Sequence, residues 1–273
     1  MRIANAAGAT NPNTLERDGS ISVHNFLNGN LIQYPGIGQS IIYGDRYTTL
    51  GKIGQKTLNG GGGVSLAGDF TTLLVSTSAI QNINGINNVK VFLVSAGMPE
   101  KASFTVFNSP SPNKIGVKMN NHGWLVMHDA ENFTYGNKLG LIKVYKYSGG
   151  PSGTYSQIGQ DIYTNNWSPG GYGNSVSISL NSVHNYSYDV NNPLYLDRVK
   201  IVVGSYYHDL NITRFGLINA FVLDSLQQFI PFGDDFLRGD TIDDQFGLTC
   251  DISEDGNHII GGDEIISMQK SKS

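Results

Sequence analysis

The stretch Gly140-Leu-Ile-Lys-Val-Tyr-Lys-Tyr147 decides the fold of this chain, together with Tyr155-Ser-Gln-Ile-Gly-Gln-Asp-Ile162, which follows it. Apolar and polar residues alternate along the first segment, which is the period of a half-buried β-strand. Similar segments begin at Gly19, Asn87 and Gly216, so the pattern occurs four times. Recurrence on this scale indicates an architecture of repeated units.

The second segment contains a motif of the form apolar-Gly-x-x-apolar. The motif occurs at residues 37–41, 158–162 and 232–236, and its glycine lies 19, 19 and 17 residues after Gly19, Gly140 and Gly216. The repeat starts are separated by 68, 53 and 76 residues, which indicates loops of variable length on a constant core. We expect a strand at each motif, and in the second copy residues 102–107 take its place without the glycine.

A second group of segments also occurs four times. Residues 64–69, 117–123, 176–180 and 250–256 each precede an apolar run, at 73–75, 124–127, 199–203 and 259–260. The dipeptides His122-Gly123 and Asp255-Gly256 supply the positive backbone torsion that a tight hairpin needs. Each complete repeat is therefore predicted to contain four short antiparallel strands, which must stack on neighbouring units to bury their apolar faces.

The segment Phe246-Gly-Leu-Thr-Cys-Asp-Ile-Ser-Glu-Asp-Gly256 resembles the repeats of FG-GAP propellers, and its last four residues are similar to the turn of WD40 blades. Over most of residues 19–262 the chain also resembles repeat arrays found in many microbial, algal and viral proteins. This resemblance implies a β-propeller and says little about activity.

The order of the repeats predicts how the ring closes. The chain starts with the third and fourth strands of a repeat and ends with the first and second. We therefore expect an all-β propeller of about four four-stranded blades, closed by N- and C-terminal strands that share one blade. Residues 1–18 would form an N-terminal arm, residues 19–266 the propeller and residues 267–273 a C-terminal tail. The alternatives are a divergent extra blade within residues 41–60, or incomplete rings from several chains that assemble together.

Composition agrees with an all-β protein and excludes some partners. Hydrophobic residues make up 39% of the chain, charged residues 15%, and there are 34 glycines, a profile of many turns and few helices. The net charge of −4 argues against nucleic-acid binding. The sequence contains no apolar run long enough to span a membrane and no apolar core of a secretory signal near Met1. We expect a virion location, or otherwise an extracellular or cytoplasmic one.

Acidic residues gather near the C-terminal end. Ten carboxylates lie between Asp234 and Glu264, against the single cation Arg238. The resemblance to FG-GAP blades implies a calcium loop beginning at Asp251, Ser253 and Asp255, because Ca²⁺ takes several oxygen ligands. The later carboxylate of such a loop falls at Ile259, so a solvated acidic turn without a cofactor is the alternative that we favour.

Aromatic residues gather in the predicted loops among asparagine and glycine. Such residues suit recognition surfaces because they combine ring contacts with hydrogen bonds at small entropic cost. The alternative is that these residue types are simply common in propeller loops. The candidate binding residues are Trp167, Tyr172, Tyr186, Tyr188, Tyr206 and Tyr207.

Catalytic patterns are not evident in the sequence. The six histidines lack metal-ligand spacing, and the adjacent pairs Asp234/Asp235 and Asp243/Asp244 are not arranged for acid–base work. Cys250 is expected to be a small apolar residue rather than a nucleophile.

The leading hypothesis is a non-enzymatic binding or assembly module, as a structural or host-attachment protein of a virus or phage particle. Its partners would be other structural proteins or a host-surface glycan or receptor, and further copies of this chain in a homo-oligomer are another expected partner. The alternatives are an extracellular adhesion or lectin-like protein, which would depend on calcium if the acidic loop binds Ca²⁺, and an intracellular protein-interaction platform.

Overall fold

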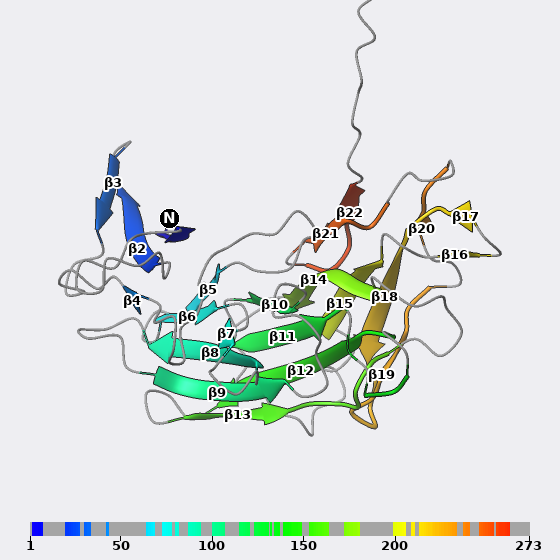
Figure 1. Ribbon diagram of the computed structural model, residues 1–273, viewed down its shortest axis with the longest axis horizontal. Coiled ribbons are helices and arrows are strands. Elements are labelled where there is room, and N and C mark those ends of the chain that lie inside the picture. The colour runs from blue at the N-terminus through cyan, green and yellow to red at the C-terminus, as the bar shows by residue number, and fades with distance from the viewer. Residues whose placement is uncertain are drawn as a thin grey trace, which may run out of the picture.

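The protein is all-β in the part that the structure describes, and the ladders between its strands are antiparallel (Figure 1). This confirms the predicted fold class at the level of secondary structure. The computed structural model describes residues 2–7, 20–27, 30–33, 42–43, 64–68, 73–77, 80–81, 87–93, 100–106, 115–120, 123–130, 132, 134–136, 139–148, 153–163, 172–180, 199–205, 209–210, 213–233, 237–240, 246–253 and 255–262.

The strands form sheets that follow one another along the chain. The first contains β1 (Arg2–Ala7), β2 (Ser20–Leu27), β3 (Asn30–Gln33) and β4 (Ile42–Tyr43). The second contains β5 (Val64–Gly68), β6 (Leu73–Thr77), β7 (Ile80–Gln81), β8 (Asn87–Leu93) and β9 (Glu100–Val106). The third contains β10 (Ile115–Met119), β11 (Trp124–Asp129), β12 (Leu141–Ser148) and β13 (Thr154–Gln157).

The C-terminal half continues this series. The fourth sheet contains β14 (Tyr172–Leu180), β15 (Val199–Ser205), β18 (Leu217–Leu223), β19 (Phe229–Pro231) and β20 (Leu237–Arg238). A small ribbon contains β16 (Asp209–Leu210) and β17 (Thr213–Arg214). The last sheet contains β21 (Thr249–Ile252) and β22 (Ile259–Gly262).

The predicted strand order is confirmed within these sheets. The first and second strands of the repeat pair as β5–β6, β10–β11, β14–β15 and β21–β22. The third strand then joins the second as β6–β8, β11–β12 and β15–β18. Gly123 and Gly256, which follow the first strands, have φ of 76° and 69°, as the predicted hairpins require.

Where the structure describes the glycine motif, at residues 158–162 and 232–233, it does not form a strand, which corrects the sequence prediction. In the third sheet β13 ends at Gln157. Beyond it, the Ile158 N–H donates to the Val144 carbonyl at 2.9 Å, and Ile162 forms an isolated bridge with Ile142 of β12. In the fourth sheet β19 and β20 pair with β18 on either side of residues 232–236. Gly159 and Gly233 have φ of 75° and 93°, a conformation that interrupts an extended strand.

The other two sheets agree with this interpretation of the motif. In the first sheet β3 and β4 both pair with β2 and flank residues 34–41, which lie outside the described residues. In the second sheet, where the motif is absent, β9 runs without interruption along β8 from Glu100 to Val106. In the third and fourth sheets the described part of the motif therefore lies between two short segments that pair with the same strand.

The N-terminal residues contain a strand that sequence analysis did not predict. β1 pairs with β2 from Arg2↔Asn25 to Ala7↔Ser20, so residues 2–7 belong to the first sheet. Among the described strands β22 pairs only with β21, and the predicted sharing of a blade between the two chain ends is not present. The reason is geometric, because β1 occupies the edge of β2 that β22 would need. Residues 267–273 lie outside the described residues, as do 44–60 and most of the 1–18 segment.

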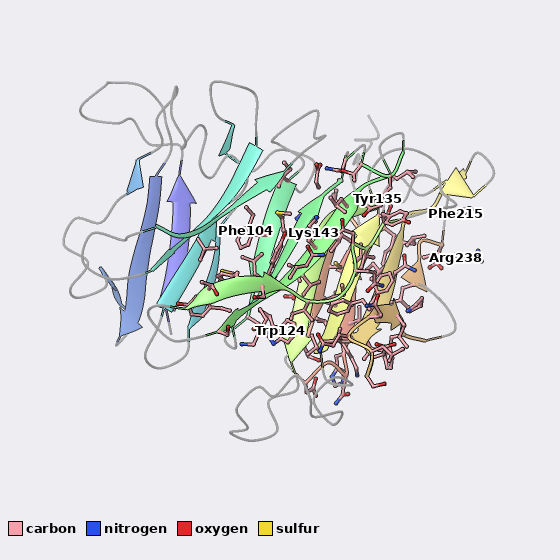
Figure 2. All side chains as sticks on the ribbon, turned by 90° about the horizontal axis from the view of Figure 1, so that it is seen from below. Phe104, Trp124, Tyr135, Lys143, Phe215 and Arg238 are labelled. Carbon is pink, nitrogen blue, oxygen red and sulfur yellow. The ribbon has the colours of Figure 1, made fainter. Side chains whose placement is uncertain are left out.

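Successive sheets stack on one another through their first strands. β1 lies beside β5, β5 beside β10, β10 beside β14, and β14 beside β21. Figure 2 shows the sheets side by side in chain order, from the blue N-terminal strands to the yellow and orange ones. A strand in the middle of the stack is covered on both faces, and all six residues of β11 are accordingly buried.

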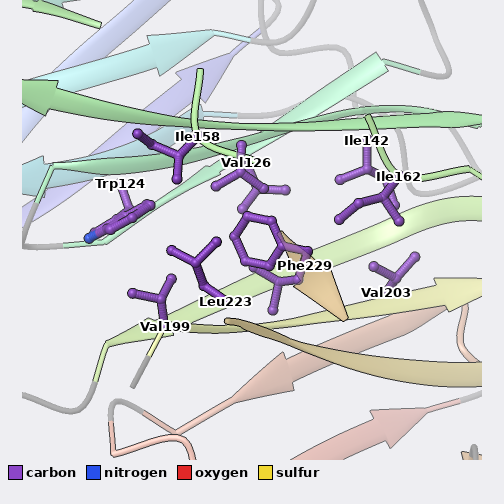
Figure 3. Close-up of a cluster of buried hydrophobic side chains, with 11 residues drawn as sticks. Trp124, Val126, Ile142, Ile158, Ile162, Val199, Val203, Leu223 and Phe229 are labelled. Atoms are coloured by element: carbon purple, nitrogen blue, oxygen red, sulfur yellow. The ribbon is translucent and has the colours of Figure 1, made fainter. Parts of the chain in front are cut away.

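The main core lies between the third and fourth sheets (Figure 3). β11 and β12 contribute side chains from one side, and β15, β18 and β19 contribute them from the other. Burial of each large apolar side chain stabilises the fold by about 1.5–3 kcal/mol. The cluster contains Trp124, Val126, Ile142, Val144, Ile158, Ile162, Val199, Ile201, Val203, Leu223 and Phe229.

The dipeptide Phe246-Gly247 joins the last sheet to the fourth. Phe246 forms an isolated parallel bridge with Gly216 and packs against Val202 and Ile218. A Cβ atom at Gly216 would collide with the backbone of Phe246, and one at Gly247 would lie 2.9 Å from the backbone nitrogen of Ser205. The two glycines therefore permit a close approach of two backbones.

Candidate functional site

The candidate calcium residues lie on the hairpin between β21 and β22. Asp251 belongs to β21, whereas Ser253 and Asp255 lie in the turn. One oxygen of Asp255 accepts hydrogen bonds from Ser253 Oγ at 2.5 Å and from the Asn257 backbone N–H at 3.0 Å. The other accepts from Asn257 Nδ2 at 3.1 Å. The hydrogen bond from Ser253 is the largest of the effects that lower the pKa of Asp255.

Two lysines from earlier sheets contact this hairpin. Lys118 of β10 places its Nζ 3.6 Å from Asp251 Oδ1. Lys200 of β15 donates a hydrogen bond to the Gly256 carbonyl at 3.1 Å and lies 4.5 Å from the centre of the Phe232 ring. Lysines from the third and fourth sheets thus contact the acidic hairpin and hold it against these two sheets.

The hairpin does not assemble a metal-ligand set in the described residues. No group of three or more His, Cys, Asp or Glu side chains there has the geometry to hold a metal ion. Glu254, which stands between the candidate ligands, lies outside the described residues. The calcium loop at Asp251, Ser253 and Asp255 that the resemblance implies, and the solvated acidic turn that we favour, therefore both stay predictions.

The candidate aromatic residues fall largely outside the described part of the chain. Tyr172 is the first residue of β14 and is paired with Ser205, with a register shift before Ser175. The other five, Trp167, Tyr186, Tyr188, Tyr206 and Tyr207, are not among the described residues.

A polar cluster that the sequence analysis missed surrounds Asp161. Tyr135 Oη donates a hydrogen bond to Asp161 Oδ2 at 2.9 Å, and Gln157 Nε2 donates one to Oδ1 at 2.9 Å. Lys143 Nζ lies 3.3 Å from Oδ2. Three donors from the β11–β12 connection, β12 and β13 thus converge on one carboxylate, and the hydrogen bond to Asp161 is the main reason that the pKa of Tyr135 is raised.

Two tyrosines stack beside this cluster. The rings of Tyr135 and Tyr163 are 3.9 Å apart at their centres and inclined by only 3°. Tyr135 is 42% exposed, and Figure 2 shows it with Lys143 toward the opposite end of the strands from Trp124. We name Tyr135, Tyr163, Asp161, Lys143 and Gln157 the tyrosine–aspartate cluster. It combines an exposed aromatic ring with oriented polar groups.

The connection that carries Tyr135 is held by buried polar residues. Asn132 donates from Nδ2 to Asp129 Oδ2 at 2.9 Å, and its Oδ1 accepts the Thr134 N–H at 2.9 Å. Asn132 is fully buried, so the sequence Asn132-Phe-Thr134 does not present a glycosylation site on the folded surface.

The sequence did contain a signal for the tyrosine–aspartate cluster. Asp161 is the fourth residue of the Ile158-Gly-Gln-Asp-Ile162 motif, and Tyr163 follows the motif directly. In an extended strand Gln157 and Asp161 would be about 13 Å apart, at about 3.3 Å per residue, so a strand at the motif did not predict their contact. The turn at Gly159 instead brings Asp161 within hydrogen-bonding distance of Gln157.

Comparison with protein-family models finds no match to this chain, and no curated protein matches it either. Among the described residues no helix is long and apolar enough to cross a membrane.

Proposed function

We propose that this chain is a non-enzymatic β-propeller that acts as a binding or assembly module, as a structural or host-attachment protein of a virus or phage particle. The observation that carries the proposal is the series of sheets that stack through their first strands, from β5 through β10 and β14 to β21. Neighbouring blades of a propeller meet through such inner strands around a central channel. The recurring positive-φ glycines, Gly140 and Gly216 before the third strand and Gly159 and Gly233 after it, support equivalent repeats.

Closure of the ring is part of this proposal. A ring of about four blades requires the two-stranded sheet of β21 and β22 to meet the first sheet. In such a ring β22 would take the edge of β2 that β1 occupies in this structure. If β21 and β22 pack on the first sheet as a separate unit instead, the ring has five units. The face of β22 that carries Ile260, which is 70% exposed, is available for such a contact.

The composition of the chain and its exposed aromatic surface support a role in a particle. A glycine-rich, weakly charged stack with an exposed aromatic site suits recognition and assembly. The expected partners are other structural proteins of the particle, or a glycan or receptor on the host surface.

The proposal is tested first by mass and shape, and then by location. Light scattering should give the 29.6 kDa monomer or a small multiple of it, and small-angle X-ray scattering should give the profile of a compact ring. An elongated open stack in solution would contradict the propeller. Immunogold labelling of purified particles from infected cells should then mark the particle surface, whereas signal confined to the infected-cell cytosol would contradict the virion role.

A second candidate function is favoured by the stacked pair of Tyr135 and Tyr163. An exposed aromatic platform beside polar groups suits an extracellular adhesion or lectin-like protein. Binding to intact cells without any association with particles would support this function over the first.

A further inference from the structure

The tyrosine–aspartate cluster has the composition of a ligand site. Its exposed hydrophobic component is the ring of Tyr135, and its polar component is the set of donors around Asp161. Ligand sites typically combine apolar or aromatic surface with a few oriented polar groups. Both components are fixed in place by contacts among the same five residues.

The platform is rigid and has one available face. One face of the Tyr135 ring is covered by Tyr163 at 3.9 Å, and the hydroxyl is held by Asp161 at 2.9 Å. Tyr135 as a whole is 42% exposed, and the ring face opposite Tyr163 is the face on which a ligand would stack. A ring held in this way loses little conformational entropy when a ligand covers it.

The charge of the cluster selects among ligands. The ammonium of Lys143 and the carboxylate of Asp161 are 3.3 Å apart, so the local charges compensate each other. An ionic ligand of either sign would have to compete with this pair. Lys143 nevertheless has three N–H donors and is partly exposed, so a neutral hydroxyl can accept a hydrogen bond from it.

We propose that the tyrosine–aspartate cluster binds a neutral sugar ring of a glycan, which stacks its C–H face on Tyr135 and hydrogen-bonds to Lys143 and Asp161. The aromatic face carries partial negative charge and attracts the partially positive C–H groups of a pyranose. The hydroxyls at the edge of the sugar then meet donors and acceptors that are already oriented. This inference deepens the proposed function, on which it rests, by assigning the class of receptor that the module recognises.

The test uses the full chain on an array of neutral, sialylated and sulfated oligosaccharides, followed by calorimetric titration with the best neutral oligosaccharide. We expect binding to neutral glycans, weakened about tenfold by Tyr135→Ala, because stacking contributes at about that level. Tyr135→Phe keeps the ring and should retain most of the affinity. Phe232→Ala removes another exposed aromatic ring, on the fourth sheet, and should leave binding unchanged.

Asp161→Asn provides an independent test of the charge argument. It leaves the Lys143 ammonium without its carboxylate, so selectivity should shift toward acidic glycans. Circular dichroism of each variant confirms that it is folded. Absence of neutral-glycan binding, equal binding by Tyr135→Ala, or binding of peptides alone would overturn the inference. If particles are labelled but the array shows no neutral-glycan binding, the glycan site is rejected and the proposed function stands. If the array shows neutral-glycan binding but particles are not labelled, the virion role is rejected and the glycan site stands.

Discussion

Gln160 binds the backbone of Phe229 through both ends of its side-chain amide. Its Nε2 donates to the Phe229 carbonyl at 2.8 Å, and its Oε1 accepts the Phe229 N–H at 2.9 Å. Gln160 follows β13 of the third sheet, and Phe229 is the first residue of β19 in the fourth sheet, so one side chain links the two sheets by hydrogen bonds. Gly159, the preceding residue, makes room for the Phe229 ring.

Replacing Gln160 with alanine should destabilise the protein by about 1–3 kcal/mol, because two partly buried hydrogen bonds are lost and the backbone of Phe229 must find other partners. The free energy of unfolding measured in urea checks this expectation. Gln228→Ala is the matched control, since that side chain donates only to the adjacent Gln227 carbonyl at 3.3 Å. Equal losses in the free energy of unfolding for the two variants would contradict a stabilising link between the third and fourth sheets through Gln160.

Gly159→Ala should also destabilise the fold, by about 1–3 kcal/mol. The residue has φ of 75°, and an added Cβ would lie 2.8 Å from Phe229 Cδ2. Thermal unfolding compares this variant with Ser156→Ala, an exposed position on β13 that should change stability little. An unchanged Tm for Gly159→Ala would show that neither the torsion nor the contact matters.

The turn at Asp255 should be sensitive to acid. Because the pKa of Asp255 is lowered in the folded protein, its carboxylate adds stability above its ordinary pKa of 3.8. This contribution is lost as the pH falls through the folded-state pKa. The Tm difference between the wild type and Asp255→Ala should therefore be present at neutral pH and shrink below pH 3.8. Asp240→Ala, at an exposed position outside the turn, is the control, and a gap that persists in strong acid would refute the turn contacts.

Tyr155→Phe should stabilise the protein by about 1 kcal/mol. The buried Tyr155 hydroxyl has no hydrogen-bond partner among the described residues, and burying such a group without a partner is costly. Burial also raises the pKa of Tyr155, so the wild type loses stability as the pH rises above the ordinary value of 10. The advantage of the phenylalanine variant in urea unfolding should therefore grow above pH 10. A less stable variant would reveal a partner for the hydroxyl.

Calcium should leave the Tm unchanged. Both carboxylate oxygens of Asp255 already accept hydrogen bonds, and Asp251 lies against Lys118. A metal ion would have to displace these contacts. Differential scanning fluorimetry with and without millimolar Ca²⁺ checks this, and a rise in Tm that Asp255→Ala abolishes would identify a calcium site instead.

Local sequence pattern was sufficient for much of the fold. The alternation in residues 140–147 and the apolar run from Trp124 identified β12 and β11. The glycines at 123 and 256 identified the hairpins β10–β11 and β21–β22. These features depend on contacts between neighbours in the chain, whose geometry follows from residue type. The sequence also indicated the position of the glycine motif within the repeat, but we predicted a strand there. The conformation at Gly159 depends on its contact with Phe229 of another sheet, which the local sequence does not reveal.

The sequence by itself determined an all-β chain of repeated antiparallel units, because strand periodicity and turn glycines act within a few residues. Only the tertiary structure decided that β1 takes the free edge of β2, since the pairing of Arg2 with Asn25 leaves no trace in residue pattern. Only it brought Tyr135 to Asp161, which are 26 residues apart in the chain. Such contacts depend on how the sheets stack and where the motif bends the chain, and those are properties of the assembled core rather than of any single segment.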